Sequence, residues 1–393
     1  MLSPAILESN IYNFMALFHF LVFSLCIACC KVDARSKVQL KEQNHFTTSD
    51  NTMRQVDNEF KCVDIYKQPA LQHPLLKNHK IQLHPTFAKN VVQSRPSYDR
   101  ECPTGKVPIY KRIKRHQIVT NSSLKLPVVD LRHYAQSTKE FHTVTLDSTQ
   151  NQIFYGAFAK ISAYNLSLNP YQYSTSSVIV ESGPPSELNS IHAGLGVRPD
   201  IYGDSQLRLT TLWTAFGSGN PGCSDNKCAG FVQVTQDKLY FIGSVQYPTT
   251  PIGASEKYHL EFKIQRDKST GNWWLIVNNP EVQVGYWPRD IFTHLSTGAS
   301  KVRFGGETFA APNTVSPPMG SGRLPQDGFQ YSALMGVLQH IDTNYNQIDL
   351  YPAYMKVYND AKKECYDLMF KENLTFLYRR AILYGGPGGH CNL

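Results

Sequence analysis

The sequence predicts an all-β protein, a sandwich or a barrel, and three observations lead to this fold class. The chain of 393 residues holds 25 glycines and 23 prolines, which favour many turns and short strands over long helices. From about residue 140 onward, short runs of strand-forming residues recur, with turn signals every ten residues or so. With 41% hydrophobic and 18% charged residues, the chain can form a buried core.

The clearest strand is predicted at residues 258–265, where apolar and polar residues alternate as they do in a half-buried strand. One face would carry Tyr258, Leu260, Phe262 and Ile264, and the other His259, Glu261, Lys263 and Gln265. The following STGNWW predicts a hairpin turn. Further strands are predicted in QLRLTTLW, GFVQVTQ, NWWLIVNN, VQVGYW and KVRFGGE.

One helix is predicted, over residues 288–295. Pro288 suits a first helical turn, and Gly298 is placed to end the helix. Ile291, Phe292 and Leu295 would form its apolar face.

The N-terminus indicates the compartment. Residues 14–30 form an apolar stretch of signal-peptide length, so residues 1–34 are predicted to be a signal peptide, with Met15 as a possible true start. No second apolar run of about 20 residues follows. We therefore expect a soluble protein outside the cytosol, extracellular or vacuolar, with no membrane partner.

Six cysteines remain after the leader, and an even number in a secreted chain predicts three disulfides with fifteen possible pairings. The simplest pairing is sequential: Cys62–Cys102, Cys223–Cys228 and Cys365–Cys391. A zinc site is the rival interpretation, but neither CxxC nor HExxH occurs. We expect no metal.

After the leader we expect three parts: an N-terminal segment over residues 35–118, a linker over 119–139 and a β-domain over 140–393. Much of the local excess of the formal charge of +8 lies in residues 106–117. This run could be a nucleic-acid arm or a solvated connector; we favour the connector, and expect no nucleic-acid partner. Arg112–Arg115 is a candidate processing site. Three sequons are candidate glycosylation sites: Asn121, Asn165 and Asn373.

The search for chemistry leaves one carboxylate of interest. The chain has no GxSxG elbow and no phosphate-binding loop, and we expect no cofactor. Three glycine-rich segments remain: IHAGLGVRPDIYGD, VRFGGETF and PMGSGRLPQDGF. Such glycines let a backbone approach a ligand closely. Glu307 follows Gly305 and Gly306, so its carboxylate could face a groove, or it could be an ordinary exposed strand residue.

Several long motifs resemble the plant neprosin family. CVDIYKQPALQHPLLKNHKIQ and CPTGKVPI look like the family's activation peptide. IYGDSQLRLTTLWTAFGS, VGYWPRDIFTHLSTGASKVRFGGE, MGSGRLPQDGF and YGGPGGHCNL look like its C-terminal domain. The resemblance implies two facing antiparallel sheets, a cleavable prosegment and a glutamic endopeptidase that works in acid and cleaves after proline.

The family uses two glutamates, and the resemblance places one of them at Glu307. Where the family has the second, in its IEAGW motif, this chain reads IHAGL, so His192 replaces the catalytic glutamate and Leu195 replaces the adjacent tryptophan. A tryptophan there would be expected to exclude water from the carboxyl pair. The candidate cleft residues are Gly194, Leu195, Gly305, Gly306, Met319, Gly320 and Ser321.

The replacement predicts a loss of acid chemistry. Two adjacent carboxyls split their pKa values, so that one acts as base and the other as acid. Histidine has an ordinary pKa near 6.5, is a cation in acid, and would pair with Glu307 instead of sharing a proton with it. The favoured prediction is a monomeric binding protein for proline-containing or other extended peptides.

Two alternatives stay open. One is an endopeptidase of altered mechanism, in which neutral His192 is the base and Glu307 orients it or acts as acid. The other is a carbohydrate or cell-wall binder that uses an aromatic surface made of Trp273, Trp274, Tyr286 and Trp287. Core packing is the favoured interpretation of those aromatics.

Overall fold

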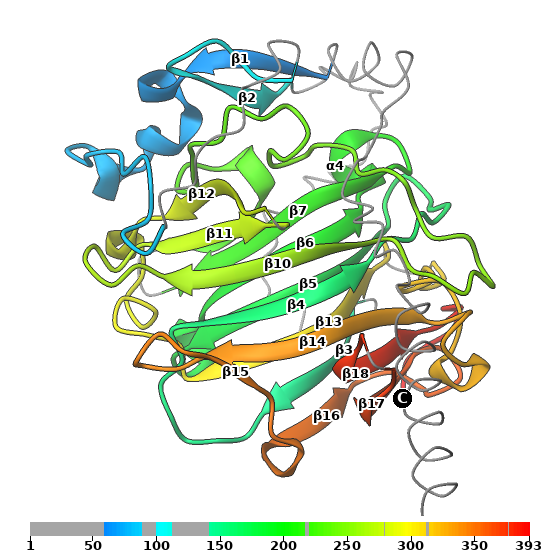
Figure 1. The fold of residues 1–393 in the computed structure, drawn as a ribbon. Helices are drawn as coiled ribbons and strands as arrows, with labels where there is room; N and C mark the ends of the chain where they lie inside the picture. The colour runs from blue at the N-terminus through cyan, green and yellow to red at the C-terminus, as the bar shows by residue number, and fades with distance from the viewer. Residues whose placement is uncertain are drawn as a thin grey trace, which may run out of the picture. The chain divides into compact units, whose positions relative to one another are not determined.

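A computed structural model describes residues 59–88, 100–111, 141–216, 220–278, 280–311, 314–375 and 377–393. Within these residues the strands form two large antiparallel sheets and one small one (Figure 1). The predicted antiparallel β-sandwich is therefore confirmed. The predicted signal peptide, the linker over 119–139 and the basic tetrapeptide at 112–115 lie outside the described residues.

The first large sheet has nine strands. In sheet order its path is β17 (Asp367–Asn373), β18 (Arg379–Gly385), β14 (Ala333–Ile341), β4 (Gly156–Ser162), β10 (His259–Arg266), β11 (Trp273–Val277), β12 (Val282–Trp287) and β9 (Val232–Gln233), with β15 (Gln347–Asp349) beside β14. β10 and β11 form the hairpin that STGNWW predicted.

The second large sheet has seven strands. Its order is β16 (Met355–Asn359), β3 (Phe141–Ser148), β13 (Lys301–Phe309), β5 (Tyr173–Ser182), β6 (Asn189–Val197), β7 (Leu207–Ala215) and β8 (Asn220–Ser224). In Figure 1 this sheet lies behind the first.

The core lies between the two sheets and follows from strand alternation, which sends every second side chain to the same face. On β10 the predicted apolar residues Leu260, Phe262 and Ile264 are all fully buried. The fourth, Tyr258, precedes the strand and is 43% exposed, so its assignment to the buried face was wrong. Across the gap, Val178 on β5 lies opposite Ala193 on β6, and both are fully buried. Burial of this kind stabilises by about 25 cal/mol per Å² of apolar surface.

The third sheet belongs to the predicted prosegment. It pairs β1 (Phe60–Asp64) with β2 (Lys106–Tyr110), and three short 3-10 helices follow β1: η1 (Ile65–Lys67), η2 (Pro69–Gln72) and η3 (Pro74–Leu76). The start of the basic run is thus a strand and not a solvated connector, because Val107 and Ile109 are buried against Ile65. The prediction of a connector was wrong for these residues.

The predicted helix over 288–295 is reduced to a 3-10 turn, η7 (Arg289–Ile291). Phe292 already has extended backbone angles, and its ring packs edge-on against Trp213 at 6.2 Å. Tertiary packing therefore overrides the local helix pattern. A one-turn helix that was not predicted, α4 (Pro199–Tyr202), ends at Gly203 in the left-handed conformation. The remaining 3-10 helices are η4 (Pro185–Glu187), η6 (Asp225–Lys227), η8 (Pro325–Asp327) and η9 (Pro352–Tyr354).

The four aromatic residues proposed for carbohydrate recognition do not form a surface. Trp273, Trp274, Tyr286 and Trp287 are each 0% exposed. In the full-length chain these residues are therefore part of the core, and the aromatic surface that the carbohydrate alternative requires is not present.

The three disulfides follow the sequential pairing: Cys62–Cys102, Cys223–Cys228 and Cys365–Cys391. The first closes the prosegment on itself, and the last ties the C-terminal segment to the residues before β17. Of the predicted glycosylation sites, Asn165 and Asn373 are exposed, and Asn121 lies outside the described residues.

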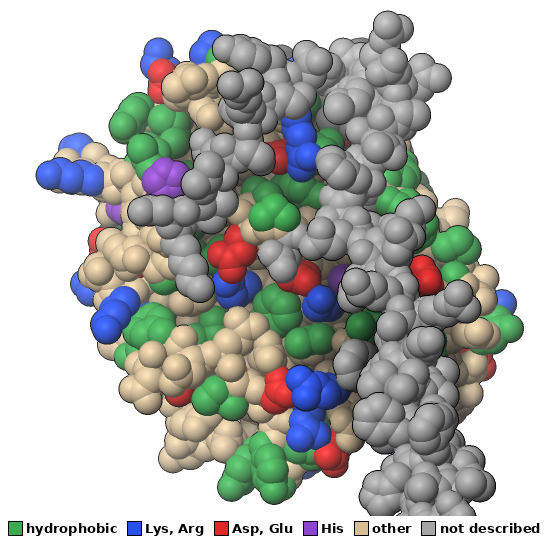
Figure 2. Space-filling model, in the orientation of Figure 1, with side chains coloured by type: hydrophobic (Ala, Val, Ile, Leu, Met, Phe, Trp, Pro, Cys, Tyr) green, Lys and Arg blue, Asp and Glu red, His purple; other side chains and the backbone are tan. Residues whose placement is uncertain are grey.

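Charged side chains of both signs are interspersed on the face seen in Figure 2. On the outer side of the nine-stranded sheet Lys160 pairs with Glu261 at 2.8 Å, and Lys263 pairs with Glu281. In the described parts of the chain, no helix is long and apolar enough to cross a membrane.

Candidate functional site

The outer face of the seven-stranded sheet is polar and nevertheless buried. Threonines and serines follow one another across its strands, among them Thr175, Ser177 and Thr210, and each is at most 7% exposed. His192 and Glu307 lie on this same face and are 6% and 7% exposed. Glu307 is therefore a buried carboxylate and not an ordinary exposed strand residue. Burying charged groups like these two is costly unless each finds a partner.

His192 and Glu307 meet above a row of small residues. Gly305 on β13 lies opposite Ser177 on β5, which lies opposite Gly194 on β6. Glu307 is two residues from this row on one side, and His192 is two residues from it on the other. Because the glycines leave the row bare, the two long side chains can reach each other over it. The Nδ1 atom of His192 lies 2.9 Å from an Oε2 oxygen of Glu307.

A chain of hydrogen bonds continues on the other side of the imidazole. His192 Nε2 lies 3.1 Å from Ser190 Oγ, and Ser190 Oγ lies 3.0 Å from Thr214 Oγ1. The Thr214 hydroxyl donates to the Leu188 carbonyl at 3.0 Å. Ser190 must then donate to Thr214, and its oxygen accepts from Nε2–H of His192. With Nδ1–H donating to an ionised Glu307, every donor in this arrangement has one acceptor.

The electrostatics of the site favour the ionised carboxylate. Burial alone would raise the pKa of Glu307, but the charge and hydrogen bond of His192, with the charges of Arg303 and Arg198, outweigh it and lower the pKa below the ordinary value. Arg303 and Arg198 are themselves paired, with Asp147 at 3.0 Å and Asp200 at 2.8 Å. In a proton-sharing pair of carboxyls, the pKa of one of the two would be raised instead.

The wall beside the pair is built around a second buried carboxylate. Asp225 accepts hydrogen bonds from the Thr211 backbone N–H at 2.6 Å, the Thr210 hydroxyl at 3.0 Å and the Tyr202 hydroxyl at 2.7 Å. Burial raises the pKa of Asp225 more than Arg198 and these hydrogen bonds lower it. Asp225 thereby holds two of the threonines that line the hollow beside the pair.

The hollow beside the pair is small in the full-length chain. Its volume is about 10 Å³, which is room for about one water molecule. The hollow is lined by Tyr173, Thr175, Ser177, His192, Arg198, Thr210, Thr211, Leu212 and Glu307. In the described residues no group of three or more His, Cys, Asp or Glu side chains could hold a metal ion. The carboxylate and the imidazole that line the hollow are those of Glu307 and His192.

Of the predicted cleft residues, only Gly194 and Gly305 share the face of the pair. Leu195 and Gly306 both lie opposite Ser176, whose hydroxyl accepts from Tyr384 of the facing sheet at 2.6 Å. Both therefore belong to the core face. The prediction that they line the cleft was wrong, because residues three apart on a strand, such as 192 and 195, point to opposite faces.

The segment around Met319 also lies away from the pair. Met319 is fully buried, and a Cβ at Gly306 would lie 2.6 Å from its sulfur on the core side. A Cβ at Gly320 would lie 2.6 Å from that of Ala333, and the Ser321 hydroxyl accepts from the Arg323 backbone N–H. Met319, Gly320 and Ser321 thus pack the sandwich and do not line the hollow.

We expect Leu195→Trp to act on stability and not on the site. A tryptophan on the core face overpacks the space between the sheets, at a cost of about 1–3 kcal/mol. Urea denaturation should show this loss, while Leu195→Met, which conserves volume, should cost less than about 1.5 kcal/mol. A stable tryptophan variant with an altered Glu307 pKa would contradict the placement of this residue.

The Glu307 carboxylate should make stability depend on pH in acid. Its folded pKa lies below the ordinary value of 4.5, so the ionised form adds stability above pH 4.5, and this is lost as the pH falls through the folded pKa. At pH 5.5 we expect Glu307→Gln to be less stable than the natural chain by about 2 kcal/mol. Thermal unfolding of both proteins between pH 5.5 and 2.5 tests this, and the gap should close at the acid end. A gap that widens in acid would contradict the shift.

Several residues of the site were missed from the sequence. Ser190 and Arg303 lie two and four residues from the predicted pair along the same strands, so the two-residue period alone could have placed them on its face. Arg198, Tyr173 and Asp225 come from loops or other strands, and no local pattern connects them to the pair.

Comparison with known proteins gives matches to family profiles and to solved structures. A family profile described as Neprosin matches residues 170–387, and one described as Neprosin activation peptide matches residues 57–157, which runs into β3 and β4. Among solved structures, scytalido-glutamic peptidase with a transition state analog inhibitor is similar at 7% identity, covering 63% of this chain and 98% of that one, with a TM-score of 0.36. SCP-B, a member of the Eqolisin family of peptidases in a complex with the tripeptide Ala-Ile-His, is similar at 7% identity, covering 63% and 97%, with a TM-score of 0.35. Since the Neprosin profile spans more than half of its residues, this chain belongs to the neprosin family.

Proposed function

We propose that this protein is a secreted peptide-binding member of the neprosin family that has lost acid peptidase activity. The observation that supports this most is the 2.9 Å contact between His192 and Glu307. A glutamic peptidase in acid needs one carboxylate to take a proton from water and one carboxyl to protonate the leaving amine. Here the second carboxyl is replaced by a group that is a cation in acid, cannot act as a base there, and holds Glu307 as its ion-pair partner instead of sharing a proton with it.

The hydrogen-bond chain strengthens this proposal. Ser190 and Thr214 are 1% and 0% exposed, and their hydroxyls lead away from the imidazole to a backbone carbonyl. The Ser190 oxygen accepts a hydrogen bond from Nε2–H of His192, which leaves Nδ1 to face Glu307. The proposed ligand is an extended peptide. That it contains proline is inferred from the resemblance to the family. Such a peptide needs a cleft wider than the hollow described above.

A second candidate function is a hydrolase that works at neutral pH. In it, neutral His192 would be the base, oriented by Glu307 on Nδ1. The observation in its favour is that Ser190 sits on Nε2, the order of groups found in serine hydrolase triads. Against it stand the burial of Ser190 and the direction of its proton toward Thr214.

A cleavage assay on proline-rich peptides from pH 3 to pH 8 separates the two functions. The protein is tested both full-length and after limited proteolysis, and peptide binding is followed by fluorescence anisotropy. We expect binding without cleavage across the range. Cleavage that rises between about pH 5.5 and 7.5 and disappears in His192→Gln would favour the hydrolase.

Two further outcomes decide the proposal. Cleavage that peaks near pH 3 and is abolished by Glu307→Gln would refute the loss of acid activity. Absence of both cleavage and binding in the proteolysed protein would refute the peptide-binding role. Ser190→Ala serves as the matched control for the triad, since it removes only the hydroxyl.

A further inference from the structure

The prosegment is joined to the sandwich by backbone hydrogen bonds of the kind found inside a domain. Cys102 donates its backbone N–H to the Gln236 carbonyl at 2.8 Å, and Lys238 donates to the Arg100 carbonyl at 2.9 Å. Glu101 and Asp237 form an antiparallel bridge between these bonds. Residues 100–102, before β2, therefore pair as a short strand with residues 236–238 in the loop after β9.

Two glutamines form a reciprocal pair across the same boundary. The Gln68 side chain donates to the Gln233 carbonyl at 3.1 Å and accepts from the Gln233 backbone N–H at 2.8 Å. The Gln233 side chain in turn donates to the Pro108 carbonyl of β2. Both glutamines are at most 2% exposed. Removing the prosegment would leave the buried groups of Gln233 without these partners, which is costly.

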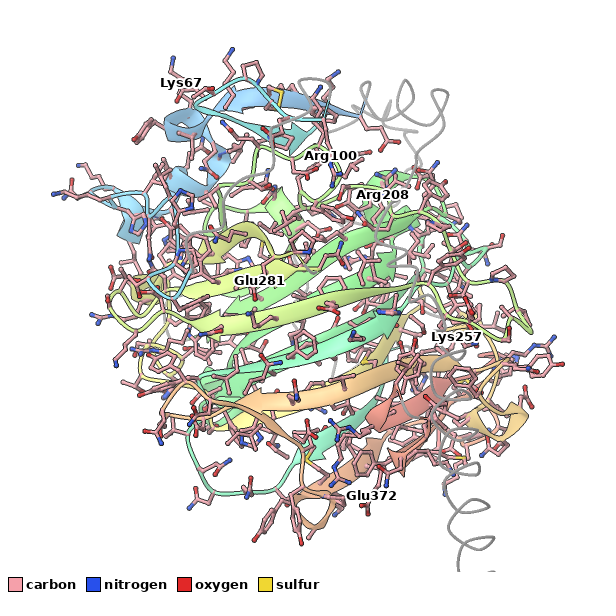
Figure 3. The ribbon with its side chains drawn as sticks, in the orientation of Figure 1. Lys67, Arg100, Arg208, Lys257, Glu281 and Glu372 are labelled. Carbon is pink, nitrogen blue, oxygen red and sulfur yellow. A yellow bond between two sulfur atoms is a disulfide. The ribbon has the colours of Figure 1, made fainter. Side chains whose placement is uncertain are left out.

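One buried arginine of the sandwich has two carboxylate partners, and the prosegment supplies one of them. Arg208 on β7 is 0% exposed, and its guanidinium makes a bidentate contact with Glu59 at 2.8 and 3.2 Å. Its other carboxylate partner is Asp204 at 2.8 Å. Tyr110 of β2 packs edge-on against Tyr202 at 4.7 Å, next to this ion pair. Arg100 and Arg208 are labelled in Figure 3, where both lie between the β1–β2 pair and the strands below.

The prosegment also covers an aromatic patch on the nine-stranded sheet. Ala70 packs in one cluster with Trp274 and Tyr286, and these two rings are fully buried. The Tyr286 hydroxyl lies 2.7 Å from the His79 ring and accepts from the Gln82 backbone N–H at 2.9 Å. Next to this patch Thr86 donates both its N–H and its hydroxyl to Asp267.

From these contacts we propose that residues 59–111 remain bound to the sandwich as a non-covalent subunit after the chain is cut between them. The inference goes beyond the proposed function, since it concerns assembly and not the His192–Glu307 pair. In the described residues no disulfide joins the two parts, because Cys62 and Cys102 pair with each other. Retention therefore depends on the hydrogen bonds, the buried ion pair and the covered aromatic patch. The cleavable prosegment of the family would here be a permanent component.

The test is made on the full-length protein with a specific protease site inserted between residues 118 and 119. After cutting under non-reducing conditions, the two fragments are run on size exclusion at about 1 µM and neutral pH. We expect them to co-elute, with tryptophan fluorescence unchanged because Trp274 stays covered. Separate elution together with a red-shifted emission would overturn the inference and leave the proposed function untouched.

Variants test which prosegment contacts hold the cut fragments together. Glu59→Gln leaves Arg208 with one carboxylate, and we expect the cut fragments to bind about 100-fold more weakly, as for a broken buried ion pair. The matched control is Tyr66→Ala, since this prosegment ring is 70% exposed and should change nothing. Equal retention in Glu59→Gln and Tyr66→Ala would contradict the interface described above. If Glu59→Gln fails to fold, Gln68→Ala takes its place with the same expected order.

Discussion

Replacing His192 by glutamate is expected to create acid peptidase activity. The new carboxyl would face Glu307 across the bare row of Gly305, Ser177 and Gly194, and two adjacent carboxyls split their pKa values into an acid and a base. Supplying a missing acid or base role raises the rate by about 10² to 10⁴. The change is measured as cleavage of proline-rich peptides between pH 2.5 and pH 6, after limited proteolysis.

Two controls accompany this variant. His192→Gln fills the same space without a carboxyl and should stay inactive. Combining His192→Glu with Glu307→Gln should abolish the new activity. A folded His192→Glu protein that cleaves nothing would show that the cleft has changed at more than this one position. Adding Leu195→Trp should not raise the rate, because that side chain lies on the core face.

The largest loss of stability is expected for Arg208→Ala. The guanidinium is fully buried and bonded to Glu59, Asp204 and the Gly243 carbonyl, and it lies 4.5 Å from the centre of the Tyr202 ring. Removing one partner of such a buried pair typically costs about 3–5 kcal/mol. Urea denaturation monitored by tryptophan fluorescence measures this loss.

The matched control is the same substitution at a surface arginine. Arg289 pairs with Asp290 at 3.6 Å, and the two side chains are 51% and 63% exposed. Arg289→Ala should cost less than about 1 kcal/mol. Similar losses at both positions would contradict the role given to the buried network.

The sequence was a good guide to the strands and a poor one to the helix. Alternation placed β10 and the buried side chains at 260, 262 and 264 correctly, because a half-buried strand imposes that pattern residue by residue; only Tyr258, before the strand begins, is exposed. The apolar residues at 288–295 have helical spacing, yet Phe292 is drawn into contact with Trp213, a residue far away in the sequence. Local periodicity cannot anticipate a contact of this kind.

At the site, the sequence pointed to the two central residues and failed on their surroundings. His192 and Glu307 came from the resemblance, and the structure brings them together. Leu195 and Gly306 were assigned to the cleft although the two-residue period places them on the opposite face from the pair. Arg198 and Asp225 could not be predicted, since only the packing of loops against β6 and β7 brings them to the site.

The most direct test of the account is a pH titration of the Glu307 carboxyl carbon by NMR. If the carboxylate is held ionised beside His192, its pKa lies below the ordinary 4.5, and His192→Gln raises it, since burial is then less opposed. A Glu307 pKa above 4.5 that does not change in His192→Gln would contradict the ion pair, and with it the explanation for lost acid activity.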